Sequence, residues 1–257
     1  MTLGAGAAVT VHQSIGENSI DPRPVLIVTG LAQEARIAAG PGMIVICSSS
    51  DPQQLRALLA TLDSQTFRGV VSFGVAGGLD PSLKTGDVVV ATEVMAGDTR
   101  FLADMALNEE MIASAALKRS LMSRRRRVVR GMLAGVERVV AASDRKAELH
   151  SETGAAAVDM ESHIAAAYAA QAGIPFAALR VISDPAHRAL PELAQNAIKP
   201  NGDICMRTIV RGVVRNPKTL SGLVSTGIDF NRALRSLRGC RGFLVGGDRF
   251  ATAEAAA

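Results

Sequence analysis

Residues 154–184, GAAAVDMESHIAAAYAAQAGIPFAALRVISD, predict a buried strand, a helix and a second buried strand in succession. Apolar residues at 155–158 form the first run, and an Ala-rich segment follows as far as Gly173, a residue type favoured just after a helix. The last run, 176–182, is apolar enough to lie inside a parallel sheet. Strands that alternate with helices in this way are typical of α/β domains.

The chain before this stretch continues the alternation. Short apolar runs, separated by helix-like segments with Gly, Pro, Ser or Asp at their ends, occur at 25–28, 43–47, 69–73 and 88–91. We therefore expect an α/β fold over residues 25–190, a three-layer sandwich with a mostly parallel, mixed central sheet. Flanking segments read as a loose leader (1–24), a basic helical extension (191–245) and a disordered tail (246–257).

Composition excludes several classes of protein. A transmembrane helix requires an uncharged apolar run of about 18 residues, and the 257 residues contain no such run. Cys47, Cys205 and Cys240 form no paired motif, so we expect neither a disulfide framework nor a metal site, in keeping with a reducing cytoplasm. With no Trp and one Tyr, the chain lacks the aromatic residues of a nucleic-acid-binding platform, and we expect no nucleic-acid partner.

Carboxylates follow both strands of the 154–184 stretch. Glu161 comes shortly after the first apolar run, and Asp184 ends the second. Because ligands of open α/β sheets bind outside the carboxyl ends of strands, we expect these two acids to meet over one crevice. The alternative is that they are ordinary loop acids, one of which caps a helix.

Residues 74–78, GVAGG, directly follow the apolar run at 69–73, and we expect a Gly-rich turn there. Such a turn lets the backbone approach a ligand closely and can direct N–H groups at its oxygen atoms. Many strand-to-helix turns contain glycine for steric reasons alone, so this motif is not specific by itself.

Four motifs in register resemble one enzyme superfamily over residues 25–184. They are Glu34 after Thr29-Gly30, SFGVAGGL (72–79) followed by Gly86-Asp87, AVDMES (157–162) and RVISD (180–184). Together they resemble the nucleoside phosphorylase and methylthioadenosine/adenosylhomocysteine nucleosidase superfamily. The motif TGLAQEAR (29–36) and the basic C-terminal extension look most like the hopanoid-associated branch of this superfamily. That resemblance implies removal of adenine from adenosylhopane in hopanoid biosynthesis.

The resemblance implies roles for individual residues. Asp184 matches the acid that protonates the purine at N7, which requires a raised pKa, and Ser183 would orient it. Glu161 matches the carboxylate that accepts hydrogen bonds from the ribose hydroxyls, with Met160 packed against the sugar. Glu34 matches the nucleosidase residue that polarises an attacking water.

The sequence leaves two candidates for the nucleophile, water and inorganic phosphate. Glu34 favours water, although a helix N-terminal acid favoured by the macrodipole is the alternative for it. Ser72 stands where purine phosphorylases have an arginine, which weakens the case for phosphate. Inorganic phosphate is nevertheless an alternative co-substrate, because a pocket could be built from Gly30, Arg36, Ser48 to Ser50, Gly74, Val75, Ala76 and Gly77. No other cofactor is implied.

The basic C-terminal segments, 204–214 and 220–237, have apolar residues at helical spacing. They would either lie on an anionic membrane, which suits a lipid-linked adenine nucleoside, or pack on the domain with arginine facing water. We expect a cytoplasmic homo-oligomer, peripheral at the inner face of the membrane in the first case. The rival functions are a nucleosidase acting on small nucleosides and a catalytically idle nucleoside-binding or membrane-scaffold protein.

Overall fold

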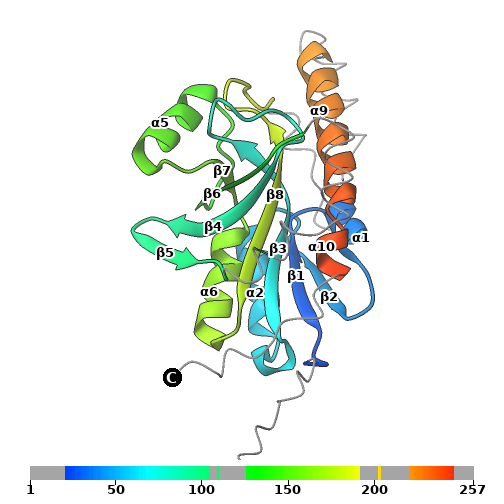
Figure 1. The fold of residues 1–257 in the computed structure, drawn as a ribbon. Coiled ribbons are helices and arrows are strands. Elements are labelled where there is room, and N and C mark those ends of the chain that lie inside the picture. Colours follow the sequence, from blue (N-terminus) through cyan, green and yellow to red (C-terminus); the bar gives the residue numbers. More distant parts are fainter. Residues whose placement is uncertain (1–20, 105–108, 110–125, 192–201, 204–219, 246–257) are drawn as a thin grey trace, which may run out of the picture.

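Figure 1 shows an α/β domain built around one sheet, with helices on both faces. The structure is a computed structural model, and it describes residues 21–104, 109, 126–191, 202–203 and 220–245. Within these ranges the sheet has eight strands, β1 (Val25–Thr29), β2 (Met43–Cys47), β3 (Gly69–Gly78), β4 (Val88–Ala96), β5 (Thr99–Leu102), β6 (Val128–Gly135), β7 (Ala157–Asp159) and β8 (Phe176–Asp184). The helices there are α1 (Ala32–Ala38), α2 (Pro52–Ala60), α5 (Ser143–Thr153), α6 (Ser162–Ala172), α9 (Leu220–Gly239) and α10 (Gly242–Val245), with a 3₁₀ turn at Ser64–Thr66.

The sheet is mixed, as the sequence predicts. Parallel pairs join β1 to β2 and β3, β3 to β8, β4 to β6, and β6 to β7. Antiparallel pairs join β3 to β7, and β4 to β5 and β8. Because β8 pairs with both β3 and β4, the strands β3, β8, β4, β6 and β7 close into a ring instead of forming a fully open sheet.

The predicted Gly-rich turn at residues 74–78 is wrong, because these residues continue β3 as far as Gly78. The register between β3 and β8 shifts between Ala76 and Gly77, where Ser183 of β8 has no partner in β3, and Gly77 and Gly78 also pair with β7. An extra residue in one strand bends that strand and increases its twist, so the irregular strand here is β8. The glycines that indicate a turn therefore belong to the end of β3, which pairs with β8 on one side and with β7 on the other.

Two apolar cores lie on opposite faces of the sheet. Helices α1, α9 and α10 pack on one face, and α2 and α6 pack on the other (Figure 1). Successive residues of β8 alternate between the cores: Ala177 and Leu179 belong to the first, and Phe176 and Ala178 to the second. Side chains of a strand alternate in direction, so a strand that is apolar throughout is buried on both faces.

The helix ends coincide with signals in the sequence. Asp51 caps α2 by accepting hydrogen bonds from the N–H groups of Gln53 and Gln54 at 2.8 and 3.2 Å. Helices α5 and α6 end at Gly154 and Gly173, whose φ angles of 71° and 66° lie in the left-handed region that favours glycine. The order strand, helix, strand predicted for residues 154–184 is therefore confirmed as β7, α6 and β8.

Helix α9 packs on the same core as α1 and β8, with Ala233, Leu234 and Leu237 buried there. Its outer face carries Val224 and Ile228, which are half-exposed. The expected helix at 204–214, the disordered end at 246–257 and most of the leader lie outside the described residues. Among the helices that the structure describes, none is long and apolar enough to cross a membrane.

Candidate active site

A cavity of about 270 Å³ lies at the carboxyl ends of β7 and β8, beside the end of β3. Glu161 and Asp184 both line it, together with Met160 and Ser183. The two acids predicted to meet over one crevice therefore do so. Strand β3 sets this geometry, because its Gly77 pairs with Val158 of β7 on one side and with Asp184 of β8 on the other.

Glu161, the N-cap residue of α6, is buried. Ser48 Oγ donates a hydrogen bond to Glu161 Oε1 at 3.3 Å, and Arg180 Nη2 donates to Oε2 at 3.5 Å. Burial raises the pKa of Glu161 to about 7 against the attraction of Arg180, and the nearby carboxylates of Asp159 and Glu34 add to the rise. Glu161 therefore changes charge near neutral pH.

Glu34 lies in the first turn of α1 and is 1% exposed. Its Oε2 accepts hydrogen bonds from the N–H groups of Gly30 and Leu31, both at 2.9 Å, and its Oε1 accepts from Val75 N–H at 2.8 Å. Burial raises the pKa of Glu34, while Arg180 and the three N–H donors lower it. Glu34 thus caps its helix and also joins it to β3. It does not itself line the cavity, but Leu31 and Val75 do.

Arg180 of β8, to which the sequence analysis gave no role, is fully buried among these acids. Its Nη2 donates to Ser72 Oγ at 2.7 Å, Asp159 Oδ1 at 3.0 Å and Ser162 Oγ at 3.1 Å. One guanidinium therefore holds the end of β7 and the start of α6 in place below Glu161. An arginine inside an apolar strand is rare unless it is paired, and that signal could have singled it out.

Two glycines give these charged groups their space. A Cβ atom on Gly30 would lie 2.8 Å from Glu161 Oε1, and one on Gly74 would lie 2.5 Å from Arg180 Nη1 and 2.8 Å from Glu34 Oε1. Real Cβ atoms do not approach other atoms so closely, so any larger residue would displace the acids. The glycines of the sequence motifs thus serve close packing of the site.

Asp184, at the end of β8, is 9% exposed. Ser183 Oγ donates to its Oδ1 at 2.6 Å, and Lys146 Nζ donates to its Oδ2 at 2.6 Å. Burial raises the pKa of Asp184, whereas the Lys146 ammonium and the Ser183 hydrogen bond lower it. The sequence analysis placed Ser183 beside this acid but missed Lys146, which lies in α5, a helix that reads as charged and exposed.

The residues predicted to hold the nucleophile or phosphate divide into two groups. Those that line the cavity are Val75, Ala76, Gly77 and Ser50, and those that do not are Gly30, Arg36, Ser48, Ser49 and Gly74. Arg36 does not reach it: its side chain is 67% exposed on the outer side of α1 and forms an ion pair with Asp203 at 2.8 Å. The structure therefore does not bring Arg36 into the cavity that holds Glu161 and Asp184.

The walls of the cavity beyond the acids are largely apolar. They include Leu31, Val136, Val140, Leu190, Leu223 and Phe230. Phe230, on α9, is the one aromatic side chain among the described lining residues. Those lining residues contain no Lys, Arg or His.

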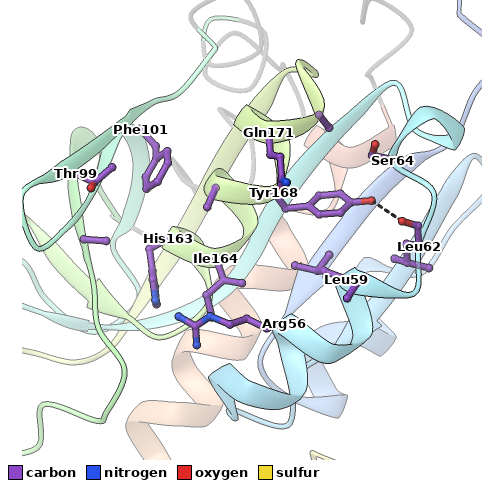
Figure 2. A pocket seen from close by; sticks show the side chains of 14 residues that line it. Arg56, Leu59, Leu62, Ser64, Thr99, Phe101, His163, Ile164, Tyr168 and Gln171 are labelled. Atoms are coloured by element: carbon purple, nitrogen blue, oxygen red, sulfur yellow. Dashed lines mark hydrogen bonds between the residues drawn. The ribbon is translucent and has the colours of Figure 1, made fainter.

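A second, larger cavity of about 730 Å³ lies between α2, α6 and β5 (Figure 2). Figure 2 shows Tyr168 directed at Leu62, whose carbonyl accepts a hydrogen bond from the hydroxyl at 3.5 Å. Arg56 and His163 lie at its edge and both bond to Glu137. Its described lining contains no carboxylate, whereas two carboxyl groups meet in the smaller cavity. The smaller cavity is therefore the candidate active site.

Buried acids at the ends of β7 and β8, on either side of β3, give this α/β protein an acid-lined cavity. Within the described residues, no three His, Cys, Asp or Glu side chains are grouped to hold a metal ion. The family model described as the phosphorylase superfamily matches residues 23–212. Because this match spans most of the chain, the protein belongs to the phosphorylase superfamily.

Relatives at greater distance agree with this assignment. The chain is 25% identical to a 5′-methylthioadenosine/S-adenosylhomocysteine nucleosidase from Actinobacillus succinogenes over 191 residues, 70% of this chain and 74% of the relative. The nucleosidase of the same name from Neisseria meningitidis, in complex with methylthio-immucillin-A, superposes with a TM-score of 0.58 at 21% identity, over 87% of this chain and 96% of that one. Futalosine hydrolase from Helicobacter pylori gives a TM-score of 0.55 at 20% identity, over 74% of this chain and 98% of that one.

These similarities confirm the predicted enzyme class, nucleoside phosphorylase or nucleosidase. At such identities the solved structures show the shared fold. The hopanoid-associated branch stays a prediction.

Proposed function

We propose that the protein releases adenine from an adenine nucleoside by hydrolysing its N-glycosidic bond. The observation that carries the proposal is the meeting of Asp184 and Glu161, both buried, in one otherwise apolar cavity. Cleavage of a purine nucleoside makes two separate demands, a proton for the base and a negative charge beside the sugar. The two carboxyl groups supply one each.

Asp184 is the proposed acid. Adenine is a poor leaving group as an anion, so protonation at N7 while the bond breaks lowers the barrier. The raised pKa of Asp184 keeps more of it protonated near neutrality than an exposed aspartic acid would be. Ser183, which donates to Oδ1, fixes the orientation of the carboxyl group.

Glu161 is the proposed ribose ligand. As the glycosidic bond breaks, the sugar gains positive charge and its hydroxyls become more acidic. An ionised carboxylate that accepts their hydrogen bonds therefore stabilises the transition state more than the ground state. Met160, which also lines the cavity, would pack against the sugar.

Water is the nucleophile that the cavity favours. A phosphate ion would meet two acids and no cationic side chain among the described lining residues, and would be repelled. Glu34 binds the N–H groups of Leu31 and Val75, two residues of the cavity wall. We assign it the role of polarising a water molecule held at that wall.

The apolar walls favour a nucleoside with an apolar 5′ substituent. Leu31, Val136, Leu223 and Phe230 offer no partners for a charged or strongly polar group. Methylthioadenosine fits this description, and the similarity to methylthioadenosine nucleosidases supports it as the small substrate. Phe230 is the proposed stacking partner of the adenine.

A lipid-linked substrate, adenosylhopane, is the second candidate, and helix α9 is the observation that favours it. Leu223 and Phe230 on this helix line the cavity, while Val224 and Ile228 are 52% and 53% exposed on its outer side. Apolar side chains thus continue from the cavity wall to the outer surface. Arg232 and Arg238 on the same helix are exposed, which suits contact with an anionic leaflet.

Adenine release from methylthioadenosine, adenosylhomocysteine and vesicle-borne adenosylhopane tests these assignments. Comparable or faster release from adenosylhopane supports the lipid substrate, whereas efficient release from methylthioadenosine alone removes it. Binding without any adenine release would identify a catalytically idle protein. Flotation with anionic vesicles tests the membrane contact, and light scattering tests the predicted homo-oligomer.

The variant Asp184→Asn tests the acid. We expect adenine release to fall by about 10²-fold or more, as on removal of a general acid. Asp144→Asn, at an exposed position in the first turn of α5, is the matched control and retains activity. Near-normal turnover by Asp184→Asn would contradict the assignment.

A further inference from the structure

Lys146 is fully buried, with 0% of its surface exposed. Its Nζ donates to Asp184 Oδ2 at 2.6 Å and lies 3.0 Å from the carbonyl oxygen of Arg188, 3.2 Å from that of Asp184 and 3.4 Å from that of Pro185. An ammonium group has three N–H donors, so these four acceptors leave none unused. Lysine is rarely buried unless it is paired, and here the partner is the proposed acid.

Lys146 stands behind the acid and does not line the cavity. Lys146 belongs to α5, whereas Asp184 ends β8. The fold therefore brings together two residues that are 38 positions apart in the chain. Its hydrogen bonds also fix the backbone from 184 to 188. The position is that of a group that acts on the substrate through Asp184.

We propose that Lys146 is a positioning residue that holds Asp184 in place and stabilises the carboxylate formed when Asp184 gives its proton to the leaving purine. This inference rests on the proposed function. In the step, the O–H bond of Asp184 breaks and an N–H bond forms at N7. The electron pair of the bond from C1′ to the purine passes to the base, which leaves neutral. A water oxygen bonds to C1′ and the water gives up one proton, which balances the proton that Asp184 has lost.

The charge on Asp184 arises only as the proton leaves. A positive group 2.6 Å from the carboxyl oxygen therefore stabilises the transition state more than the protonated ground state. Burial alone raises the pKa of Asp184 and would make it a weaker acid; the Lys146 ammonium offsets that effect. The site thus combines a dry cavity with an acid strong enough to act.

Other groups face Asp184 as well. Ser183 of β8 donates to its second carboxyl oxygen, and Arg188, after β8, adds a weaker attraction. The charge of Arg188 is balanced by Asp229 of α9, with which it forms an ion pair. Neighbouring β3 contributes Gly77, which carries no charge. Lys146 is therefore the dominant positive group beside the acid.

The test compares Lys146→Gln, which keeps a hydrogen-bond donor but no charge, with Lys146→Arg, which keeps the charge. In Lys146→Gln we expect kcat to fall about 10- to 100-fold with little change in KM. The alkaline limb of its kcat/KM profile moves up by about one pH unit or more, because loss of the positive charge raises the pKa of Asp184. Lys146→Arg keeps the limb in place, and Lys84→Met, at an exposed lysine, leaves both parameters unchanged.

A loss of activity in Lys146→Gln without any shift of the alkaline limb would overturn the proposal, since a merely structural role predicts that result. Urea unfolding checks that each variant is folded. If Lys146→Gln fails to fold, Lys146→Arg still tests the proposal. A shift of one pH unit in the alkaline limb of its kcat/KM profile would contradict the argument from charge, because this variant keeps the positive charge.

A ¹³C-carboxyl NMR titration, with the Asp184 signal assigned through Asp184→Asn, measures the same shift without turnover. Absence of adenine release from the wild-type protein would remove the proposed function. The titration of Asp184 in wild type and Lys146→Gln would still decide whether Lys146 controls this acid.

Discussion

Glu161 couples the stability of the protein to pH. Burial raises its pKa from 4.5 to about 7 in the folded protein. A rise of about 2.5 units corresponds to about 3 kcal/mol, at about 1.4 kcal/mol per unit. Because the folded state favours the protonated form, this contribution is fully present below pH 4.5, and it is lost as the pH rises through about 7.

The perturbation that isolates this effect is Glu161→Gln, which keeps the shape of the side chain and cannot ionise. Urea unfolding of both proteins between about pH 4.5 and pH 8 gives the free energy of unfolding at each pH. The wild-type value minus the variant value should fall by about 3 kcal/mol across this window. Glu152→Gln, at an exposed position, serves as the control. The difference in the free energy of unfolding between the wild type and this variant should not change with pH. A constant difference, or one that grows with pH, would refute the reasoning, because Glu161 would then be ionised throughout.

Activity should rise with pH through about 7, because Glu161 must be ionised to accept hydrogen bonds from ribose; the kcat/KM profile measures this, and an acidic limb below pH 5 contradicts it. Gly74→Ala places a Cβ atom 2.5 Å from Arg180 Nη1 and should lower both activity and the free energy of unfolding, the latter by about 1–3 kcal/mol. Gly40→Ala, whose Cβ atom would meet nothing nearer than 3.5 Å, should change neither, and equal effects would refute the packing argument. Phe230→Leu should raise KM for methylthioadenosine severalfold with little change in kcat, and an unchanged KM would exclude stacking on Phe230.

The strand, helix and strand of residues 154–184 could be predicted because their signals are local. Gly173 ends the helix in the left-handed conformation, and the apolar run at 176–182 becomes a strand buried on both faces. The meeting of Glu161 and Asp184 could be predicted as well. The physical reason differs from the rule for parallel strands, because β7 runs antiparallel to β3 and β8 runs parallel to it. The acids meet because Gly77 of β3 pairs with Val158 on one side and with Asp184 on the other.

The closed ring of strands could not be predicted, because it depends on pairings between distant segments. At Gly77, next to the register shift with β8, β3 pairs with both β8 and β7. In the sequence, the glycines around it have the composition of a turn. Local propensity was overridden here by the pairing of strands, as is common for β structure.

The charged residues around the two acids could not be predicted from the sequence either. Helix α5, SDRKAELHSET, has the composition of an exposed charged helix, and only its packing against residues 184–188 shows that Lys146 is buried. Arg36 presents the opposite case, since its charge near Glu34 suggested a phosphate ligand. In the helix it projects outward and pairs with Asp203. Helical direction and tertiary contact, not spacing in the sequence, decide which charges reach the site.

The central claim is that a purine N-glycosidic bond is hydrolysed in the cavity between Glu161 and Asp184. The most direct measurement is adenine release by the purified protein with and without inorganic phosphate, together with identification of the sugar product by mass. The account predicts the same rate in both conditions and a free, unphosphorylated sugar, because the described lining of the cavity has two acids and no cation. A phosphorylated sugar that forms only when phosphate is present would contradict hydrolysis and the role assigned to Glu34.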